Sequence, residues 1–311
     1  MREIAALLFV SVVLGPCSKE DKASPAGSGS AAASAAPAAS APPVAAKPRK
    51  PGEMPAPFDF PSGATTAKAG DWVLVPSGGW IDEAFTKGGD KQTFIYYAAT
   101  MVAPGPVESK VKSQTGSEFT APNAFIIPIK SGQKGKVGDI VLTWWQTGSG
   151  MQRSIVVAGG SEDEPKVLHL DMDLDNPTKQ AEKPDTLKKN TFHKLSAGLE
   201  PGITVGCKDG SKTKRWTVTS VSPDKLFVIG FAGSMAVVKK SDCTAIPPSA
   251  TFAVGKDASI PWSGSYYQGK VDKVDAKIGR VFVKINPFEE KIMGVGVQDV
   301  SSAPLGQPSK K

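Results

Sequence analysis

Short alternating segments near the carboxyl end constrain the fold of this chain more than any other feature. Within residues 254–302, apolar and polar positions alternate in 270–274, 280–285 and 292–297. A period of two places successive side chains on opposite faces, as in a half-buried strand. Because small turn segments separate these strands, this region predicts a small, strongly bent antiparallel barrel.

The same pattern recurs upstream. The phrase Gly70-Asp71 precedes one strand-like run, and Gly138-Asp139 precedes a second. Gly202 and Gly255 open two further blocks. The third block aligns with the fourth, with 216–221 over 269–274 and 226–228 over 281–283. Such self-similarity indicates an internal repeat. We therefore predict four β blocks and a disordered tail, at 67–130, 131–198, 199–250, 251–303 and 304–311.

Composition supports an all-β chain. The 311 residues include 32 Gly and 26 Pro, which favours many short strands and turns over long helices. In the first block, 83–86 and 93–97 predict a hairpin around 87–91.

The amino terminus has the features of an export signal. Arg2 precedes the apolar run 4–14, which is too short to span a membrane. Residues 18–66 then form a linker dominated by Ala, Pro, Ser and Gly. This composition cannot bury enough apolar surface to offset the entropy of ordering, so we expect a disordered tether. A passive spacer is the alternative to a tether that lets an anchored domain search its surroundings.

Residues 1–17 resemble a bacterial lipoprotein signal peptide. In that pattern the chain is cut before a Cys that is then acylated; here Leu14, Gly15 and Cys17 match it. Pro16 departs from the pattern, because a small residue is usual there. The resemblance implies lipidation of Cys17, a membrane anchor and a place in the cell envelope. Ser18 resembles the residue that follows the Cys in outer-membrane lipoproteins. An ordinary signal cut elsewhere, or left uncut, is the alternative.

The fourth block resembles the Tudor and Agenet family of small five-stranded, SH3-like barrels. The matching residues are Tyr266, Tyr267, Gly269, Val271, Val274, Val281, Val283, Asp299 and Val300. The third block keeps the strand pattern but lacks the aromatic pair. The resemblance implies tandem SH3-like barrels and a peptide or protein partner, bound in some family members by a cage of aromatic rings through cation–π attraction. The corresponding cage candidates are Trp262, Tyr266, Tyr267 and Phe288. Aromatic residues that only cap the core, and a generic binding groove, are the alternatives.

Cys207 and Cys243 lie at the ends of the first and last predicted strands of the third block. In an oxidising envelope we expect a disulfide between them, since these strands can be neighbours in a closed barrel. Two buried free thiols are the alternative.

The net positive charge suggests a second class of partner, a polyanion. The net charge is +7, with the lysines scattered along the chain. Some of them could form one basic face on the third barrel that binds a polyanion, either nucleic acid or an acidic glycan. The residues of this face are Lys212, Lys214, Arg215, Lys239 and Lys240.

A weak calcium-loop pattern occurs in the second block. The candidate ligands are Asp171, Asp173, Asp175 and Glu182. The alternative is an edge strand whose aspartates lie in water and discourage pairing with other chains. His169 and His193 have no metal-binding spacing, and we expect His169 on the surface.

Neither a nucleophile elbow nor a phosphate loop occurs in the sequence. We therefore expect no catalysis, no cofactor and no small-molecule substrate. The predicted function is a binding or scaffolding module on an envelope lipoprotein, and the alternative is polyanion binding.

Overall fold

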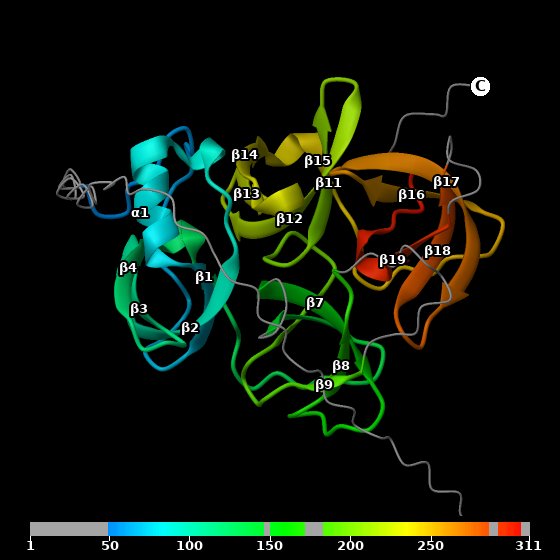
Figure 1. Cartoon of the computed structure of the whole chain (residues 1–311), viewed down its shortest axis with the longest axis horizontal. Coiled ribbons are helices and arrows are strands. Elements are labelled where there is room, and N and C mark those ends of the chain that lie inside the picture. The colour runs from blue at the N-terminus through cyan, green and yellow to red at the C-terminus, as the bar shows by residue number, and fades with distance from the viewer. Residues whose placement is uncertain (1–48, 146–149, 172–182, 286–291, 306–311) are drawn as a thin grey trace, which may run out of the picture. The chain divides into compact units, whose positions relative to one another are not determined.

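The computed structural model describes residues 49–145, 150–171, 183–285 and 292–305. Antiparallel strands dominate these residues, and α1 (Gly78–Lys87) is the one α-helix among them (Figure 1). The all-β prediction is confirmed. Within the described part of the chain, no helix has the length and apolar composition that a membrane crossing requires.

The first block forms a five-stranded sheet in the order β4-β3-β2-β1-β5. Its strands are β1 (Trp72–Pro76), β2 (Tyr96–Ala103), β3 (Glu108–Ser113), β4 (Glu118–Pro122) and β5 (Ile127–Pro128). Helix α1 and the 3-10 turn η1 (Gly89–Lys91) lie between β1 and β2, and η2 (Asn123–Phe125) precedes β5.

The second block forms a sheet in the order β10-β6-β7-β8-β9. Its strands are β6 (Ile140–Trp145), β7 (Gly150–Val157), β8 (Lys166–His169), β9 (Asp185–Thr186) and β10 (His193–Lys194). As in the first block, the last strand returns to pair with the first.

The third and fourth blocks share a nine-stranded sheet, joined where β12 pairs with β17 at Lys214 and Ser265. The strands of the third block are β11 (Thr204–Asp209), β12 (Lys212–Val221), β13 (Lys225–Ile229), β14 (Met235–Lys239) and β15 (Cys243–Ala245). The fourth contains β16 (Asp257–Trp262), β17 (Ser265–Asp275), β18 (Arg280–Ile285) and β19 (Ile292–Gly296). The 3-10 turns are η3 (Phe231–Gly233), η4 (Lys240–Asp242) and η5 (Val297–Asp299).

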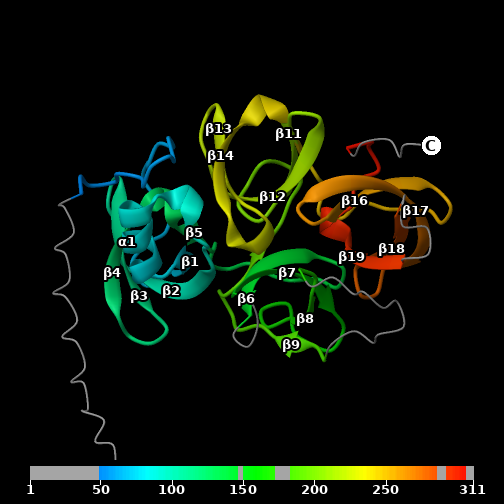
Figure 2. The same cartoon turned by 45° about the horizontal axis from the view of Figure 1, so that its top comes forward.

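In all four blocks, a late segment returns to pair with the first strand. β15 pairs with β11, and Ser301 forms a single bridge with Ser259 of β16. In Figure 2 the strands of the third block curve around their interior. Among the described residues, however, the strand pairing does not close any block into a complete ring.

One turn opens every block. In each, a glycine with positive φ donates its N–H to a carbonyl of the second strand, at 2.7–2.9 Å. The four donor–acceptor pairs are Gly70 with Met101, Gly138 with Val156, Gly202 with Val218, and Gly255 with Val271. Positive φ favours glycine because it lacks a Cβ. The sequence alignment places Val218 over Val271; both accept this bond, and both stand at a β-bulge.

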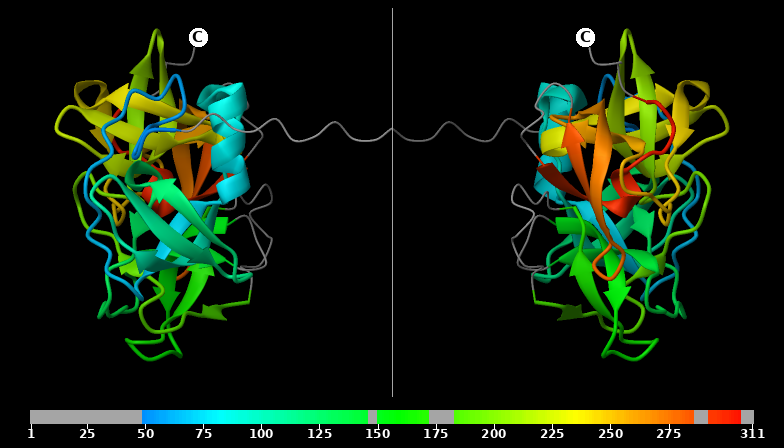
Figure 3. Two further views of the ribbon diagram at one scale, coloured as in Figure 1. Left: turned by 90° about the vertical axis from the view of Figure 1, so that its left-hand side faces the viewer. Right: turned by 90° about the vertical axis from the view of Figure 1, so that its right-hand side faces the viewer.

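Helix α1 replaces the predicted hairpin in the first block. Residues 83–86 are helical. Ser77 caps the helix by accepting the Trp80 N–H, and the buried residues Ile81 and Ala84 are three positions apart. The prediction of a hairpin was wrong because the helix cap and this helical spacing outweigh the short alternation of apolar and polar residues in 83–86. In the side views of Figure 3, α1 is the longest helical ribbon beside the strands.

The predicted linker extends too far toward the carboxyl end, because residues 49–66 are packed against the sheets. Phe58 and Phe60 are buried, with ring centroids 5.1 and 5.6 Å from that of Phe227 in β13. Asp59 pairs with Lys225 at 2.6 Å. Two buried phenylalanine rings supply the apolar surface that the preceding Ala- and Pro-rich segment lacks.

Cys207 of β11 and Cys243 of β15 stand opposite each other and are joined by a disulfide. The bond connects the first and last strands of the third block across 36 positions. It therefore holds the returning strand of this block in place.

We predict different costs for the same substitution at two of the turn glycines. No atom lies within 4 Å of a Cβ built on Gly138, so Gly138→Ala costs about 1–2 kcal/mol, from backbone conformation alone. A Cβ on Gly202 would meet Leu195 at 2.9 Å and Leu142 at 3.1 Å, so Gly202→Ala costs about 1–3 kcal/mol more. Urea titrations of the two variants measure the difference, and equal losses of stability would contradict it.

Candidate functional site

An aromatic groove of about 800 Å³ lies beside the amino end of α1. Its aromatic lining residues are Trp80 of α1, Tyr97 of β2, Phe119 of β4 and Trp144 of β6. Trp80 and Tyr97 form one wall, with ring centroids 5.7 Å apart. Tyr97 is among the few large apolar or aromatic side chains that are exposed, at 37 %. Together these rings form a concave surface that is partly open to solvent.

Local sequence determines the shape of this groove. Ser77 starts α1 directly after β1 and so places Trp80 in the first turn of the helix. A Cβ on Gly78 would lie 2.9 Å from the Phe119 ring, so only glycine lets that ring lie against the start of the helix. In β2, Tyr96 is buried and Tyr97 faces solvent, as alternation along a strand requires.

The carboxylates of the groove already have cationic partners. Asp82 lies 3.7 Å from Arg49, and Glu118 lies 2.6 Å from Lys110. The hydrogen bond from Lys110 and its charge lower the pKa of Glu118. By contrast, the Trp144 Nε1–H is buried and has no hydrogen-bond acceptor within the described part of the chain. Among the described residues, the groove therefore has little net charge, and its lining residue Trp144 has a buried donor without an acceptor.

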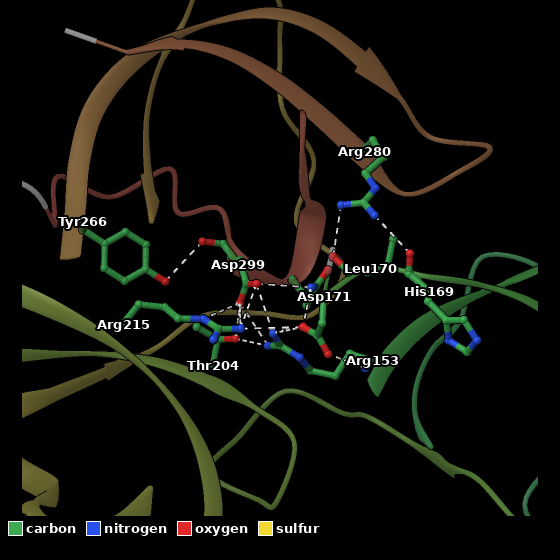
Figure 4. A network of polar contacts seen from close by, with 10 residues as sticks. Arg153, His169, Leu170, Asp171, Thr204, Arg215, Tyr266, Arg280 and Asp299 are labelled. Atoms are coloured by element: carbon green, nitrogen blue, oxygen red, sulfur yellow. Dashed lines mark hydrogen bonds and ion pairs between the residues drawn. The ribbon is translucent and has the colours of Figure 1, made fainter. Parts of the chain in front are cut away.

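A buried ionic cluster lies where strands of the second, third and fourth blocks meet (Figure 4). It consists of Arg153 of β7, Asp171 after β8, Arg215 of β12 and Asp299 of η5. Arg153 is 1 % exposed and donates to both oxygens of Asp299 at 3.0 Å, and also to Asp171 and Thr204. Arg215 donates to the same Asp299 carboxylate at 3.0–3.3 Å.

The charges of the ionic cluster compensate one another. Burial alone would raise the pKa of Asp299, but Arg153 and Arg215 outweigh it and hold this pKa at about 2. Burial lowers the pKa of Arg153, and the two aspartates more than reverse that effect. Both ion pairs therefore stay charged near neutral pH. General acid–base catalysis works best with a group whose pKa lies near the working pH, and neither Asp299 nor Arg153 meets this condition.

Arg280 extends these contacts between blocks. From β18 it donates to the backbone carbonyls of Leu170 and His169 at 3.0 Å (Figure 4). A cavity of about 530 Å³ adjoins the ionic cluster, with Arg215 and Asp171 in its lining. The side chains of the cluster are largely occupied with one another, so its clearest role is to hold the blocks together.

His169 does not lie on the surface, contrary to the prediction. Its side chain is 5 % exposed and stacks on Trp145, with ring centroids 4.8 Å apart. Its Nδ1 lies 2.8 Å from the Ser154 Oγ, and its Nε2 lies 3.0 Å from Asp185. Sequence reasoning missed this arrangement because Ser154 and His169 meet only through the pairing of β7 with β8.

A Ser-His-Asp arrangement suggests nucleophilic catalysis, but its position argues against that role. Ser154 has no exposed surface, and it lies within β7, which pairs with β6 and β8 on its two sides. A substrate therefore has no visible approach to the hydroxyl, and the neighbouring backbone groups are used in the ladders. We interpret these hydrogen bonds as structural.

The structure does not assemble the predicted aromatic cage. Tyr266 is 2 % exposed, and its hydroxyl donates to the backbone carbonyl of Asp299 at 3.1 Å. Burial, the largest cause, and the charge of Asp299 raise its pKa. Tyr267 points to the opposite face of β17, where it packs with Trp262 against the core of the fourth block. Phe288 lies outside the described residues. Including Tyr266 in an open cage was therefore wrong.

The predicted basic face is also divided. Arg215 belongs to the ionic cluster, and Lys214 pairs with Asp209 at 2.6 Å. Lys212 lies at the start of β12, whereas Lys239 is the last residue of β14 and Lys240 is the first residue of η4. The prediction was therefore wrong for Arg215, whose guanidinium is bound within the ionic cluster.

Most of the calcium-loop prediction lies outside the described residues, which exclude Asp173, Asp175 and Glu182. Asp171 is described, and its carboxylate binds Arg153 instead of lying in water. In the described ranges, no three His, Cys, Asp or Glu side chains are grouped as a metal site requires. Cys17 also lies outside these ranges.

No protein-family model matches this chain, and no curated protein is similar enough to count as a relative.

We predict that Asp299→Asn destabilises the protein by about 3–5 kcal/mol, because it removes one of the two counter-charges of the buried Arg153. The matched control is Asp257→Asn, whose partner Lys270 is 64 % exposed, and which costs less than about 1 kcal/mol. Urea unfolding at pH 7 measures both. Equal effects would show that the ionic cluster does not hold the blocks together.

Stability should also depend on pH through Asp299. Its folded pKa of about 2 lies below the ordinary value of 3.8, so the charged carboxylate stabilises the fold at neutral pH. This contribution is lost as the pH falls through 3.8 towards 2. The difference in unfolding free energy between the unmodified protein and Asp299→Asn should therefore narrow over that range. A constant difference from pH 7 to pH 2 would contradict the assignment.

Proposed function

We propose that this chain is a non-catalytic lipoprotein of the cell envelope that acts as a binding or scaffolding module. The observation that carries the proposal is the aromatic groove. Aromatic side chains provide large contact areas at a low entropy cost, and they dominate many binding surfaces. As the candidate binding surface, the groove replaces the aromatic cage that the sequence predicted from Trp262, Tyr266, Tyr267 and Phe288.

The proposal includes four tandem SH3-like barrels of the Tudor and Agenet kind. Two features support this interpretation. Every block opens on the same glycine turn, and in every block a late segment returns to the first strand. A 3-10 turn precedes that return in the first, third and fourth blocks.

Shared packing supports a scaffold that acts as one body. The ionic cluster joins the second, third and fourth blocks. Phe125 of η2 packs on Phe227 of β13, with centroids 5.2 Å apart, and thereby joins the first block to the third. A rigid set of barrels presents a preformed groove, which lowers the entropy cost of binding. The polyanion alternative has less support, because Arg215 of the predicted basic face is bound to Asp299.

Lipidation at Cys17 would place this module on a membrane, at the outer membrane if Ser18 acts as its pattern suggests. We predict that Cys17→Ser moves the protein from the membrane fraction to the soluble envelope fraction, because several acyl chains are needed for stable anchoring. Pro16→Gly, which restores the usual small residue, is the control and should leave the protein on the membrane. Retention of the Cys17→Ser variant on membranes would contradict the anchor.

We further predict that a photo-crosslinking amino acid at position 97 captures a protein partner in growing cells. The control position is Val254, which is 66 % exposed in the turn that opens the fourth block. Adducts should form at position 97 and be absent at 254, as judged by blotting and mass spectrometry. Equal adducts at both positions, or none at position 97, would remove the groove as the binding surface.

A further inference from the structure

We propose that the aromatic groove binds an extended, proline-rich peptide segment of another protein. This inference rests on the proposed function and specifies the chemistry of the partner. It follows from the hydrogen-bonding groups that the groove offers, those that it lacks, and the form of its walls.

Two kinds of hydrogen-bond donor belong to residues that line the groove. The Trp144 Nε1–H is buried and has no acceptor in the described ranges. An unpaired buried donor is costly, and a ligand oxygen that reaches it recovers this cost. The first turn of α1 also faces the groove through Gly78 and Gly79, and amide N–H groups at this position have no acceptor within the helix.

Charged acceptors in the groove are already occupied. Asp82 pairs with Arg49, and Glu118 pairs with Lys110. A ligand rich in N–H groups or positive charge would have to displace these cations. The complementary ligand instead brings carbonyl oxygens and little charge.

A proline-rich segment has this chemistry. Proline has no backbone N–H, and the polyproline II conformation leaves its carbonyls without internal partners. That conformation is largely formed before binding, so little entropy is lost on association. The ring faces of Trp80, Tyr97 and Phe119 suit flat pyrrolidine rings, which is how aromatic-lined grooves recognise such peptides.

The test uses the full-length protein and two synthetic peptides with blocked ends, ten prolines and five Gly-Ser repeats. Tryptophan fluorescence and the indole N–H signals in NMR spectra report binding. Decaproline should bind with a dissociation constant on the order of 10–1000 µM, and the Gly-Ser peptide should bind at least tenfold more weakly.

Three variants assign the contact. Trp144→Phe keeps a ring but removes the N–H, and should weaken decaproline binding about fivefold to tenfold. Tyr97→Ala removes part of a wall and should weaken it at least tenfold. Trp262→Phe is the matched control, since Trp262 packs against the core of the fourth block, and it should leave binding unchanged. Thermal unfolding confirms that each variant is folded.

Several results would overturn the inference. They are no decaproline binding at millimolar concentration, equal binding of the Gly-Ser peptide, and no weakening by Trp144→Phe or Tyr97→Ala. Self-association that Tyr97→Ala abolishes would assign the groove to a second copy of the chain. If position 97 crosslinks a partner that has no proline-rich segment, the proposed function stands and this inference fails. If neither a crosslink at position 97 nor binding of decaproline is observed, both the proposed function and this inference fail.

Discussion

The bidentate pair between Arg153 and Asp299 is the interaction on which the arrangement of the second, third and fourth blocks depends. Each side chain is almost fully buried, and each would be costly to bury alone. Asp171 and Arg215 complete the charge balance. Because these four residues come from three blocks, the cost of removing all their charges from water is offset only when those blocks are assembled. The cluster therefore favours one arrangement of the second, third and fourth blocks.

The aromatic groove depends on a different constraint, which is the close approach of α1 to β4. Gly78 permits contact with the Phe119 ring, and Ser77 determines where the helix begins. Trp80 is consequently held against Tyr97. A binding surface formed in this way needs little reorganisation, because its walls are positioned by a capped helix and a paired strand.

The local sequence pattern was sufficient to predict several features of the fold. Strict alternation predicts the strands, and positive-φ turns require glycine, so Gly70, Gly138, Gly202 and Gly255 already indicate where the blocks open. Local pattern failed at α1, where a short alternation inside a helix resembled a strand. It also failed for His169, since Ser154 comes close only through the strand register.

The sequence alone determined the all-β class and the repeated turn, because period, composition and glycine positions are local properties. Tertiary structure decided which side chains meet. Tyr266 and Arg215 are residue types that often form binding surfaces, yet both contact Asp299. Trp80 of α1 and Trp144 of β6 are far apart in the sequence, yet both line the groove. The physical reason is that a side chain's role depends on the face that its strand buries, and pairing between distant segments determines that face.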